Sequence, residues 1–379
     1  MNATDLDLRF MRRALQLAER ARGHTSPNPL VGCVVVQEGR IVGEGFHLRA
    51  GAPHAEVMAL EAAGERARGA TAYVTLEPCA HYGRTPPCTL ALVQAGVRRV
   101  VVAARDPNPQ AQGGLEILGE HGLEVSWGLL AEEARAQNEL FFFGLRQRRP
   151  QVVLKWAQSL DGQVGSRGPS RRISGTLSHQ VAHAYRQWLP AIAVGVGTVL
   201  ADNPALTVRE VDFRPFPFMV EPPPLRDPLK VIFDREARTP PGARIFERGP
   251  RGEPARVVLF TSGAPSSRVE ALKGVGAEVV DLPLEHGEPS PRAALDWLFE
   301  RGYDGLLLEG GPGLAGSFLR AGLVDRLVLF VAPKLLGEGI PALRGYSGSL
   351  EAPAELHLER VERLEEDLWI EARWEGRDV

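Results

Sequence analysis

The chain has 379 residues, 44% of them hydrophobic, and its 44 basic and 47 acidic residues give a net charge of −3. A chain of this length is expected to fold into two or three domains with full hydrophobic cores. The slightly acidic balance argues against a dedicated nucleic-acid-binding protein, which usually presents a strongly basic face. Charged residues interrupt the N-terminal stretch too early for a signal peptide, and no apolar run reaches the roughly 18 residues that a membrane span needs, so we expect a cytoplasmic protein.

Helices and strands alternate through the first part of the chain. Helical spacing of apolar residues, runs of β-branched residues and bounding Gly or Pro define the segments. The expected helices are residues 5–21, 54–63, 89–96 and one that includes 116–119, and the expected strands are residues 31–36, 41–45, 72–76 and 100–104. This alternation predicts an α/β layer with helices on the faces of a sheet.

A charged segment closed by a proline, residues 146–150, precedes a second α/β pattern. The expected strands there are residues 152–157, 191–196, 230–234, 256–260, 305–309 and 326–331, and the helices include 176–189 and 313–321. A Pro-rich segment, residues 215–228, is expected to be a mobile loop. The pattern predicts two domains, residues 1–147 and 148–379.

His54, Cys79 and Cys88 are of the types that bind zinc, and Glu56 stands two positions after the histidine. Three protein ligands leave the fourth position of zinc open for water, which is typical of a catalytic site. A histidine ligand followed by Glu at this spacing matches zinc-dependent base deaminases, in which the metal activates water and the Glu moves protons. The usual pattern ends in Cys-x-x-Cys, whereas eight residues separate the two cysteines here, so it is only partly met.

The predicted helix starts support a metal site. Pro53 suits the first turn of a helix at His54, and only at a helix start do side chains two positions apart reach one cavity. A helix N-terminus also stabilises a cysteine thiolate. The alternatives are a surface His and Glu and two spare core cysteines, and the combination of all four residues favours zinc. The third cysteine, Cys33, lies in an apolar run and is expected in the core.

Three polar residues near the motif each have two possible roles. Asn28 either hydrogen-bonds a substrate or caps the turn before the strand at residues 31–36. His81 and Arg84, between the two cysteines, either contact a substrate or order their loop. The local sequence leaves these alternatives open.

The second domain has a glycine-rich turn, residues 310–313, between a strand ending at Glu309 and a helix from Leu314. Such a turn presents backbone N–H groups and the positive end of a helix dipole to a phosphate, although a plain tight turn has the same composition. The Gly-x-Gly-x-x-Gly pattern of Rossmann dehydrogenases is absent here, and after Gly195 and Gly197 the third glycine position holds Leu200. A Rossmann dehydrogenase is therefore poorly supported.

Taken together, these motifs resemble the bifunctional riboflavin-biosynthesis deaminase/reductase family over essentially the whole chain. The resemblance rests on residues 26–33, 54–56, 77–88 and 106–109 in the first domain, and on residue 155 and residues 159–162, 198–209, 309–312 and 332–337 in the second. The long spacing between the cysteines is this family's own variant. The resemblance implies an α/β protein with a cytidine-deaminase-like three-layer N-terminal domain and a dihydrofolate-reductase-like C-terminal domain.

The resemblance also implies two successive reactions. The first is zinc-dependent hydrolytic deamination of 2,5-diamino-6-(5-phosphoribosylamino)pyrimidin-4-one, and the second is reduction by NADPH of the ribosyl side chain of the resulting uracil to ribityl. The implied partner is a small phosphorylated pyrimidine, with no nucleic acid and no membrane, and the implied assembly is a homo-oligomer, a dimer or a tetramer.

Family roles carry over to matching positions. Zinc ligands would be His54, Cys79 and Cys88, with Glu56 as proton shuttle. NADPH would meet Ser159, Thr198, Asp202, Gly311, Pro312, Gly313, Leu314, Ala315, Gly316 and Ser317. Substrate would meet Ser170, Arg186, Leu206, Arg209 and Glu309. Arg172 stands where family members often carry Trp, and its cation is expected to contact the 2′-phosphate of NADPH.

Two chemical roles in the reductase follow from residue type. Arg186 and Arg209 suit bidentate binding of the substrate 5′-phosphate, the alternative being ordinary surface charge. Hydride delivery to the sugar carbon also requires a proton, and the candidates are Lys155, Asp202 and Glu309. We favour Asp202 and Lys155, although Asp202 alternatively caps the turn that follows it.

The sequence motifs are also compatible with two other functions. A single-function base deaminase would use its second domain only for binding or dimerisation, but the paired arginines and the glycine-rich turn favour a second active site. A structural zinc module with an interaction domain is opposed by the three-ligand set with a free Glu, because structural zinc is usually held by four ligands.

Overall fold

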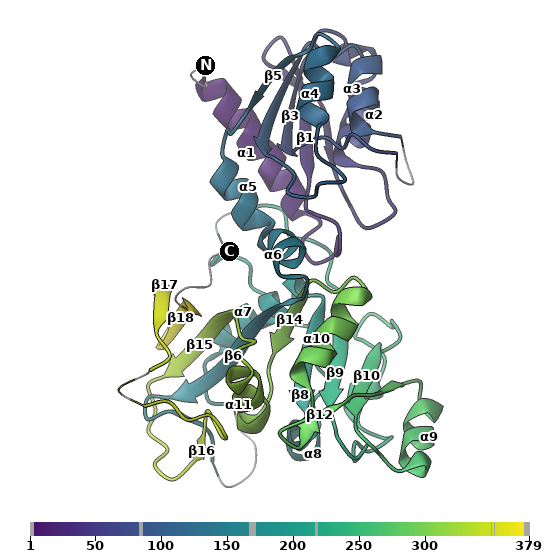
Figure 1. Ribbon diagram of the computed structural model, residues 1–379. Coiled ribbons are helices and arrows are strands. Elements are labelled where there is room, and N and C mark those ends of the chain that lie inside the picture. The colour runs from purple at the N-terminus through teal and green to yellow at the C-terminus, as the bar shows by residue number, and fades with distance from the viewer. Residues whose placement is uncertain are drawn as a thin grey trace. The chain divides into compact units, whose positions relative to one another are not determined.

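The computed structural model describes residues 4–82, 86–166, 172–216, 219–349, 351 and 353–374. The contacts divide the chain into two compact units, residues 1–146 with 213–224, and residues 147–212 with 225–379 (Figure 1). None of the helices in the described ranges has the length and hydropathy that a membrane span needs.

The Pro-rich segment has no helix or strand among its described residues, and residues 213–224 belong to the first unit. Its mobility stays a prediction. Phe216 and Met219 are buried, and Glu221 forms an ion pair with Arg13, with 2.7 Å between the charged atoms. Prolines restrict the backbone of the unfolded chain, so anchoring such a segment costs less conformational entropy than anchoring an ordinary loop.

Five strands form one sheet in the described part of the first unit, in the order β2-β1-β3-β4-β5. They are β1 (Gly32–Gln37), β2 (Arg40–Phe46), β3 (Thr71–Leu76), β4 (Arg99–Ala104) and β5 (Glu124–Trp127). Strands β1 and β2 form an antiparallel hairpin, β1 pairs antiparallel with β3, and β3, β4 and β5 are parallel. The carboxyl ends of these parallel strands therefore lie at one edge, where the loop after β3 carries Cys79.

Helices cover both faces of this sheet. They are α1 (Asp5–Glu19), α2 (Ala55–Ala63), α3 (Cys88–Gln94), α4 (Gly114–Glu120), α5 (Ala131–Gln137) and α6 (Glu139–Gln147), with a 3₁₀ turn at Gly64–Ala67. Successive strand residues point to opposite faces, so Val35 belongs to the hydrophobic cluster that includes residues of α2, α3 and α4, and Val34 belongs to the cluster that includes residues of α1. A capping box formed by Thr4 and Asp7 starts α1. The result is the expected three-layer α/β domain.

Nine strands form one sheet in the described part of the second unit, in the order β11-β10-β9-β8-β14-β6-β15-β18-β17. They are β6 (Gln151–Ser159), β8 (Ala191–Gly195), β9 (Leu229–Phe233), β10 (Val257–Thr261), β11 (Glu278–Asp281), β14 (Gly305–Leu308), β15 (Arg326–Ala332), β17 (Leu356–Leu364) and β18 (Asp367–Trp374). From β11 to β15 neighbouring strands are parallel, whereas β18 and β17 are antiparallel to their neighbours. Two short pairs add β7 (Gln163–Gly165) with β16 (Ile340–Pro341) and β12 (Leu284–Glu285) with β13 (Glu288–Pro289).

The helices of the second unit are α7 (Thr176–Trp188), α8 (Val196–Asp202), α9 (Ser266–Gly274), α10 (Pro291–Glu300) and α11 (Pro312–Arg320), with a 3₁₀ turn at Arg244–Phe246. Helices α10 and α11 pack through Leu295, Leu298 and Phe318 against one face of the sheet. Strand β14 lies between β8 and β6 although it comes later in the chain. Open parallel sheets bind ligands beyond the carboxyl ends of the strands where the strand order reverses, and α8 and α11 both start at that edge.

Candidate active sites

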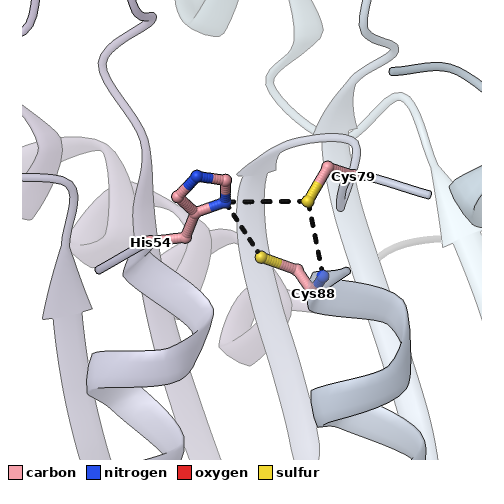
Figure 2. A group of neighbouring side chains, drawn as sticks. All are labelled: His54, Cys79 and Cys88. Carbon is pink, nitrogen blue, oxygen red and sulfur yellow. Dashed lines mark hydrogen bonds between the residues drawn. The ribbon is translucent and has the colours of Figure 1, made fainter. Parts of the chain in front are cut away.

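The three predicted zinc ligands come together at the edge of the first sheet (Figure 2). His54 is the N-cap of α2, Cys79 follows β3, and Cys88 is the first residue of α3. The His54 Nδ1 atom lies 3.1 Å from Cys88 Sγ and 3.6 Å from Cys79 Sγ, and the ligand atoms all lie within 4.8 Å of one another. Zinc bonds of about 2.0–2.3 Å at tetrahedral angles would separate ligand atoms by roughly 3.5–3.8 Å. The donor set and its spacing therefore fit zinc.

The start of α3 favours a thiolate at this site. The backbone N–H of Cys88 donates to Cys79 Sγ over 3.3 Å, as expected at a helix N-terminus. The pKa of Cys79 is lowered to about 4, mainly by a hydrogen bond with the Cys88 thiol and also by His54. The pKa of Cys88 is raised by its hydrogen bond with Cys79 and by burial.

Glu56 lies in the first turn of α2 and is buried, with 3% of its surface exposed. Burial raises its pKa to about 7. It lines a cavity of about 510 Å³ together with His54, Cys79 and two other predicted residues, Asn28 and His81. A carboxyl group with a pKa near neutrality is suited to accepting and returning a proton. Arg84 lies outside the described residues.

Asn28 is oriented by a histidine that the sequence analysis missed. His47 Nδ1 lies 3.1 Å from the carbonyl oxygen of Pro53, so Nδ1 carries the proton and donates it. His47 Nε2 then accepts from Asn28 Nδ2 over 3.0 Å. The Asn28 side chain therefore bonds His47, and both residues line the cavity. No local motif surrounds His47, which follows β2, so only the tertiary contact reveals it.

A second missed residue, Asp106, also lines this cavity. It belongs to a motif that the sequence analysis used only for the family resemblance. Burial raises the pKa of Asp106 to about 6, although the hydrogen bond from the backbone N–H of Asn108 lowers this pKa. Glu77 holds the surrounding loop by accepting backbone hydrogen bonds from Asp106 and Gly113 at 3.3 and 3.1 Å.

The second unit has a cleft of about 690 Å³ beyond the ends of β6, β8 and β14. The structure brings these predicted residues together in its lining: Lys155, Thr198, Asp202, Glu309, Gly311, Pro312, Gly313, Leu314 and Ala315. The glycine-rich turn forms the N-terminus of α11, with Gly311 as N-cap. Asp202 ends α8, and the C-cap after it is Asn203 with φ of 42°.

Three other predicted cofactor contacts, Ser159, Gly316 and Ser317, are not among the residues that line this cleft. Ser159 is buried, and its hydroxyl bonds Asp161 and accepts the N–H of Gln163 over 3.0 Å. Gly316 faces the backbone, because a Cβ atom there would lie 1.9 Å from the Arg344 carbonyl oxygen. Ser317 lines a neighbouring cavity.

Arg172 lies near His179 of α7. Burial lowers the pKa of His179 most, and the positive charge of Arg172 lowers it further. Ser170 lies outside the described residues. The cofactor role of Arg172 and the substrate role of Ser170 stay predictions.

Three of the predicted substrate residues, Arg186, Arg209 and Glu309, lie close to the buried His183 of α7. Its Nδ1 accepts the backbone N–H of Arg209 over 3.1 Å, and burial lowers its pKa to about 2, so the imidazole is neutral. Arg209 also donates to Thr207 Oγ1 over 2.9 Å, and Leu206 has φ of 50°. Sequence reasoning missed His183 because its partner lies 26 residues away.

Glu309, at the end of β14, is paired with Arg186 and lies 3.9 Å from Lys155 Nζ. Burial raises the pKa of Glu309, but Arg186 and Lys155 outweigh it and hold the pKa at about 2. The pKa of Lys155 is lowered by burial. At neutral pH Glu309 is therefore an anion, and it is less suited than Lys155 to donate a proton.

Comparisons with known proteins agree with both sites. The model of the cytidine and deoxycytidylate deaminase zinc-binding region matches residues 4–104, and that of the RibD C-terminal domain matches residues 150–370. Riboflavin biosynthesis protein RibD of Aquifex aeolicus is 44% identical over 97% of this chain and 98% of its own length. The Escherichia coli protein of the same name is 42% identical over 91% of this chain and 93% of its own.

Two solved structures resemble the whole chain. A diaminohydroxyphosphoribosylaminopyrimidine deaminase/5-amino-6-(5-phosphoribosylamino)uracil reductase from Thermotoga maritima has a TM-score of 0.82 and 38% identity, covering 97% of this chain and 99% of that one. RibD of Acinetobacter baumannii has a TM-score of 0.83 and 36% identity, with the same coverage. The prediction of two activities is confirmed, and the chain belongs to the RibD family of riboflavin-biosynthesis enzymes that join a zinc-dependent deaminase to a reductase.

Proposed function

We propose that the first site deaminates 2,5-diamino-6-(5-phosphoribosylamino)pyrimidin-4-one and that the second uses NADPH to reduce the ribosyl side chain of the resulting uracil to ribityl. The observation that carries the proposal is the pair of built sites, a three-ligand metal centre beside a buried Glu and a cleft at a glycine-rich helix start. The name of the Thermotoga maritima relative supports these substrates.

In the deaminase, His54, Cys79 and Cys88 would hold zinc, which supplies a bound water of lowered pKa as the nucleophile. Glu56 faces the same cavity and would accept the proton of that water, then return it to the leaving ammonia. Asn28, oriented by His47, would hydrogen-bond the pyrimidine.

In the reductase, the start of α11 and residues Thr198 and Asp202 would hold NADPH, which supplies the hydride. The proton that accompanies the hydride would come from Lys155 or Asp202. Lys155 is the better supported because burial lowers its pKa and so eases proton release.

Arg209 would bind the substrate 5′-phosphate. Arg186 was predicted to share that role, but the Nε–Nη2 edge of its guanidinium engages Glu309 and its Nη1 donates to the carbonyl oxygen of Thr207. It would instead hold Glu309 toward the substrate. The cofactor contacts of Ser159, Gly316 and Ser317 and the substrate contacts of Ser170 and Leu206 remain proposals from family resemblance.

The domain assignment, assembly and location complete the proposal. Residues 1–147 would form the deaminase domain and 148–379 the reductase domain, close to the change of compact unit after residue 146. A homo-oligomer is supported by the edge strand β17, which exposes Leu358 and Val361 at 58% and 56%. Three free cysteines, two of them in the metal site, support a reducing cytoplasm.

Mass spectrometry tests the proposal directly. The diaminopyrimidine ribosyl phosphate is incubated with zinc-loaded protein, with and without NADPH. Deaminated product alone without NADPH, and deaminated and reduced product with it, are expected. Deamination in both tubes without any reduction would contradict the reductase assignment, and an unchanged substrate in both would contradict the deaminase assignment.

A further inference from the structure

His183 is fully buried in the middle of α7, and the proposed reactions give it no role. Its ring packs against that of His179, with 4.6 Å between the ring centres. Its two ring nitrogens face Arg209 and Arg186, which are both predicted substrate residues. Buried polar groups usually have hydrogen-bond partners, so these two contacts indicate what the imidazole does.

The contact with Arg209 determines which ring nitrogen carries the proton. His183 Nδ1 accepts the backbone N–H of Arg209 over 3.1 Å, so the proton of the neutral ring lies on Nε2. Nε2 stands 3.5 Å from Nη1 of Arg186, which is also a donor, so this contact is not a hydrogen bond. A second proton on the ring would remove the acceptor for Arg209 and place a positive charge beside Arg186. Burial and then the charge of Arg186 lower the pKa of His183 to about 2, so Nδ1 stays an acceptor at neutral pH.

The segment that leads to Arg209 has neither helix nor strand, and side chains from outside it hold its backbone. Leu206 adopts φ of 50°, a conformation that is uncommon for residues other than glycine. The backbone N–H of Val208 donates to Asp227 Oδ1 over 2.8 Å. The next N–H, that of Arg209 itself, donates to His183. The bond to His183 therefore ties the residue that carries the guanidinium directly to helix α7.

We propose that His183 is a positioning residue of the reductase: by holding the backbone of Arg209, it sets where the Arg209 guanidinium stands and how tightly the substrate 5′-phosphate binds. The inference rests on the proposed role of Arg209. A guanidinium binds phosphate through directed hydrogen bonds, so a shift of about 1 Å at its backbone weakens them. The exposed Arg209 side chain also donates to Thr207 Oγ1 over 2.9 Å, but that partner belongs to the same segment. The fixed reference in the rest of the fold is His183.

Two variants of similar shape separate the hydrogen bond from the packing. His183→Asn places an acceptor oxygen near the position of Nδ1, and His183→Leu places a methyl group there. The measurement is steady-state kinetics of the intact zinc-loaded protein with deaminated substrate and NADPH. His183→Leu should raise the KM for the substrate by roughly 5- to 30-fold, as expected for a donor left without its acceptor, with kcat and the KM for NADPH within about twofold of wild type. His183→Asn should bring the substrate KM back to within about threefold of wild type, because the acceptor is present again.

A double-variant cycle with Arg209→Ala tests whether His183 acts through Arg209. Once the Arg209 side chain is removed, His183→Leu should raise the substrate KM no further. A rise of the same factor in both backgrounds would show general damage to the site and overturn the inference. An asparagine variant no better than the leucine variant, or an equal rise in the KM for NADPH, would overturn it too.

The same kinetics distinguish failure of the positioning role from failure of the phosphate role. Thr176→Ala, at an exposed position at the start of α7, is the control and should leave both KM values and the melting temperature unchanged. If Arg209→Ala raises the substrate KM and His183→Leu does not, only the role of His183 is overturned. If Arg209→Ala leaves the substrate KM unchanged, the proposed phosphate role is wrong and the inference falls with it. Where the leucine variant does not fold, a rise of about tenfold or more in the substrate KM of a folded His183→Asn protein would overturn the inference.

Discussion

Arg186 binds both oxygens of Glu309, with Nε 2.9 Å from Oε1 and Nη2 2.7 Å from Oε2. Arg186 belongs to α7 and Glu309 follows β14, so the pair joins a helix to the centre of the sheet. Both side chains are largely buried, at 12% and 9% exposure. The same two oxygens stand at the reductase cleft, so one contact both supports the fold and positions a functional group.

Glu309→Gln should destabilise the reductase unit by roughly 3–5 kcal/mol at pH 7, because it leaves Arg186 and Lys155 buried without a partner charge. Since the folded pKa of Glu309 is lowered from 4.5 to about 2, its contribution is fully present above pH 4.5 and is lost as pH falls toward 2. Denaturant unfolding measures the free energy of unfolding of wild type and variant between pH 4.5 and 2. The difference between these two free energies should become smaller as the pH falls. Glu300→Gln, at an exposed site on α10, should show no such pH dependence, and a constant gap for Glu309→Gln would contradict the assignment.

Glu56→Gln should lower the deamination rate by about 10²- to 10⁴-fold, because the amide keeps the shape but does not accept the proton. Zinc content and the reductase activity on deaminated substrate should stay at wild-type levels. Glu61→Gln, an exposed change on the same helix, is the matched control. Full deamination by a zinc-loaded Glu56→Gln protein would show that another group moves the proton.

Cys88→Ala should reduce zinc from about one equivalent per chain to near zero and abolish deamination, since two protein ligands hold zinc poorly. Cys33→Ala removes a buried cysteine of the sheet core and should retain the metal. Elemental analysis of both purified variants provides the measurement. Retained zinc in Cys88→Ala, or its loss in Cys33→Ala, would refute the ligand set.

Arg209→Ala should raise the reductase KM for its phosphorylated substrate by roughly 10- to 100-fold, as expected for loss of a charged hydrogen bond. The KM for NADPH should hardly change. Arg209→Lys keeps the charge and should recover part of the loss. Steady-state kinetics with each substrate varied in turn decides the matter, and a rise confined to NADPH would place Arg209 on the cofactor instead.

Gly316→Ala should destabilise the reductase unit, because the new Cβ would lie 1.9 Å from the Arg344 carbonyl oxygen and backbone must move. Gly313→Ala, in the first turn of the same helix, meets nothing within 4 Å and should keep or slightly raise stability. Thermal melts of the two variants make the comparison. Equal melting temperatures would show that the α11 contact with residues 344 and 345 is dispensable.

The sequence predicted those helices, strands and site residues that depend on a pattern within a short segment of the chain. The apolar run at 305–309 becomes β14 (Gly305–Leu308), and the zinc residues meet because their motifs sit at strand and helix ends. The hairpin of β17 and β18 was missed because charged residues such as Glu359 and Arg360 occupy four of the nine positions of β17, and only Leu364 of that strand is buried. His47 and His183 were missed because their roles depend on partners 19 and 26 residues away.

The position of β14 in its sheet determines when that sheet can assemble during synthesis of the chain. Residues 305–308 pair with residues 151–154 on one side, and residues 306–308 pair with 191–193 on the other. A growing polypeptide cannot close the middle of this sheet until about four-fifths of it has left the ribosome. The strands of the first sheet are complete once residue 127 has emerged. On the ribosome, the metal-site sheet can therefore assemble while strands β8 to β11 of the reductase sheet are still separated from β6 and await β14, with β15, β17 and β18 yet to be made.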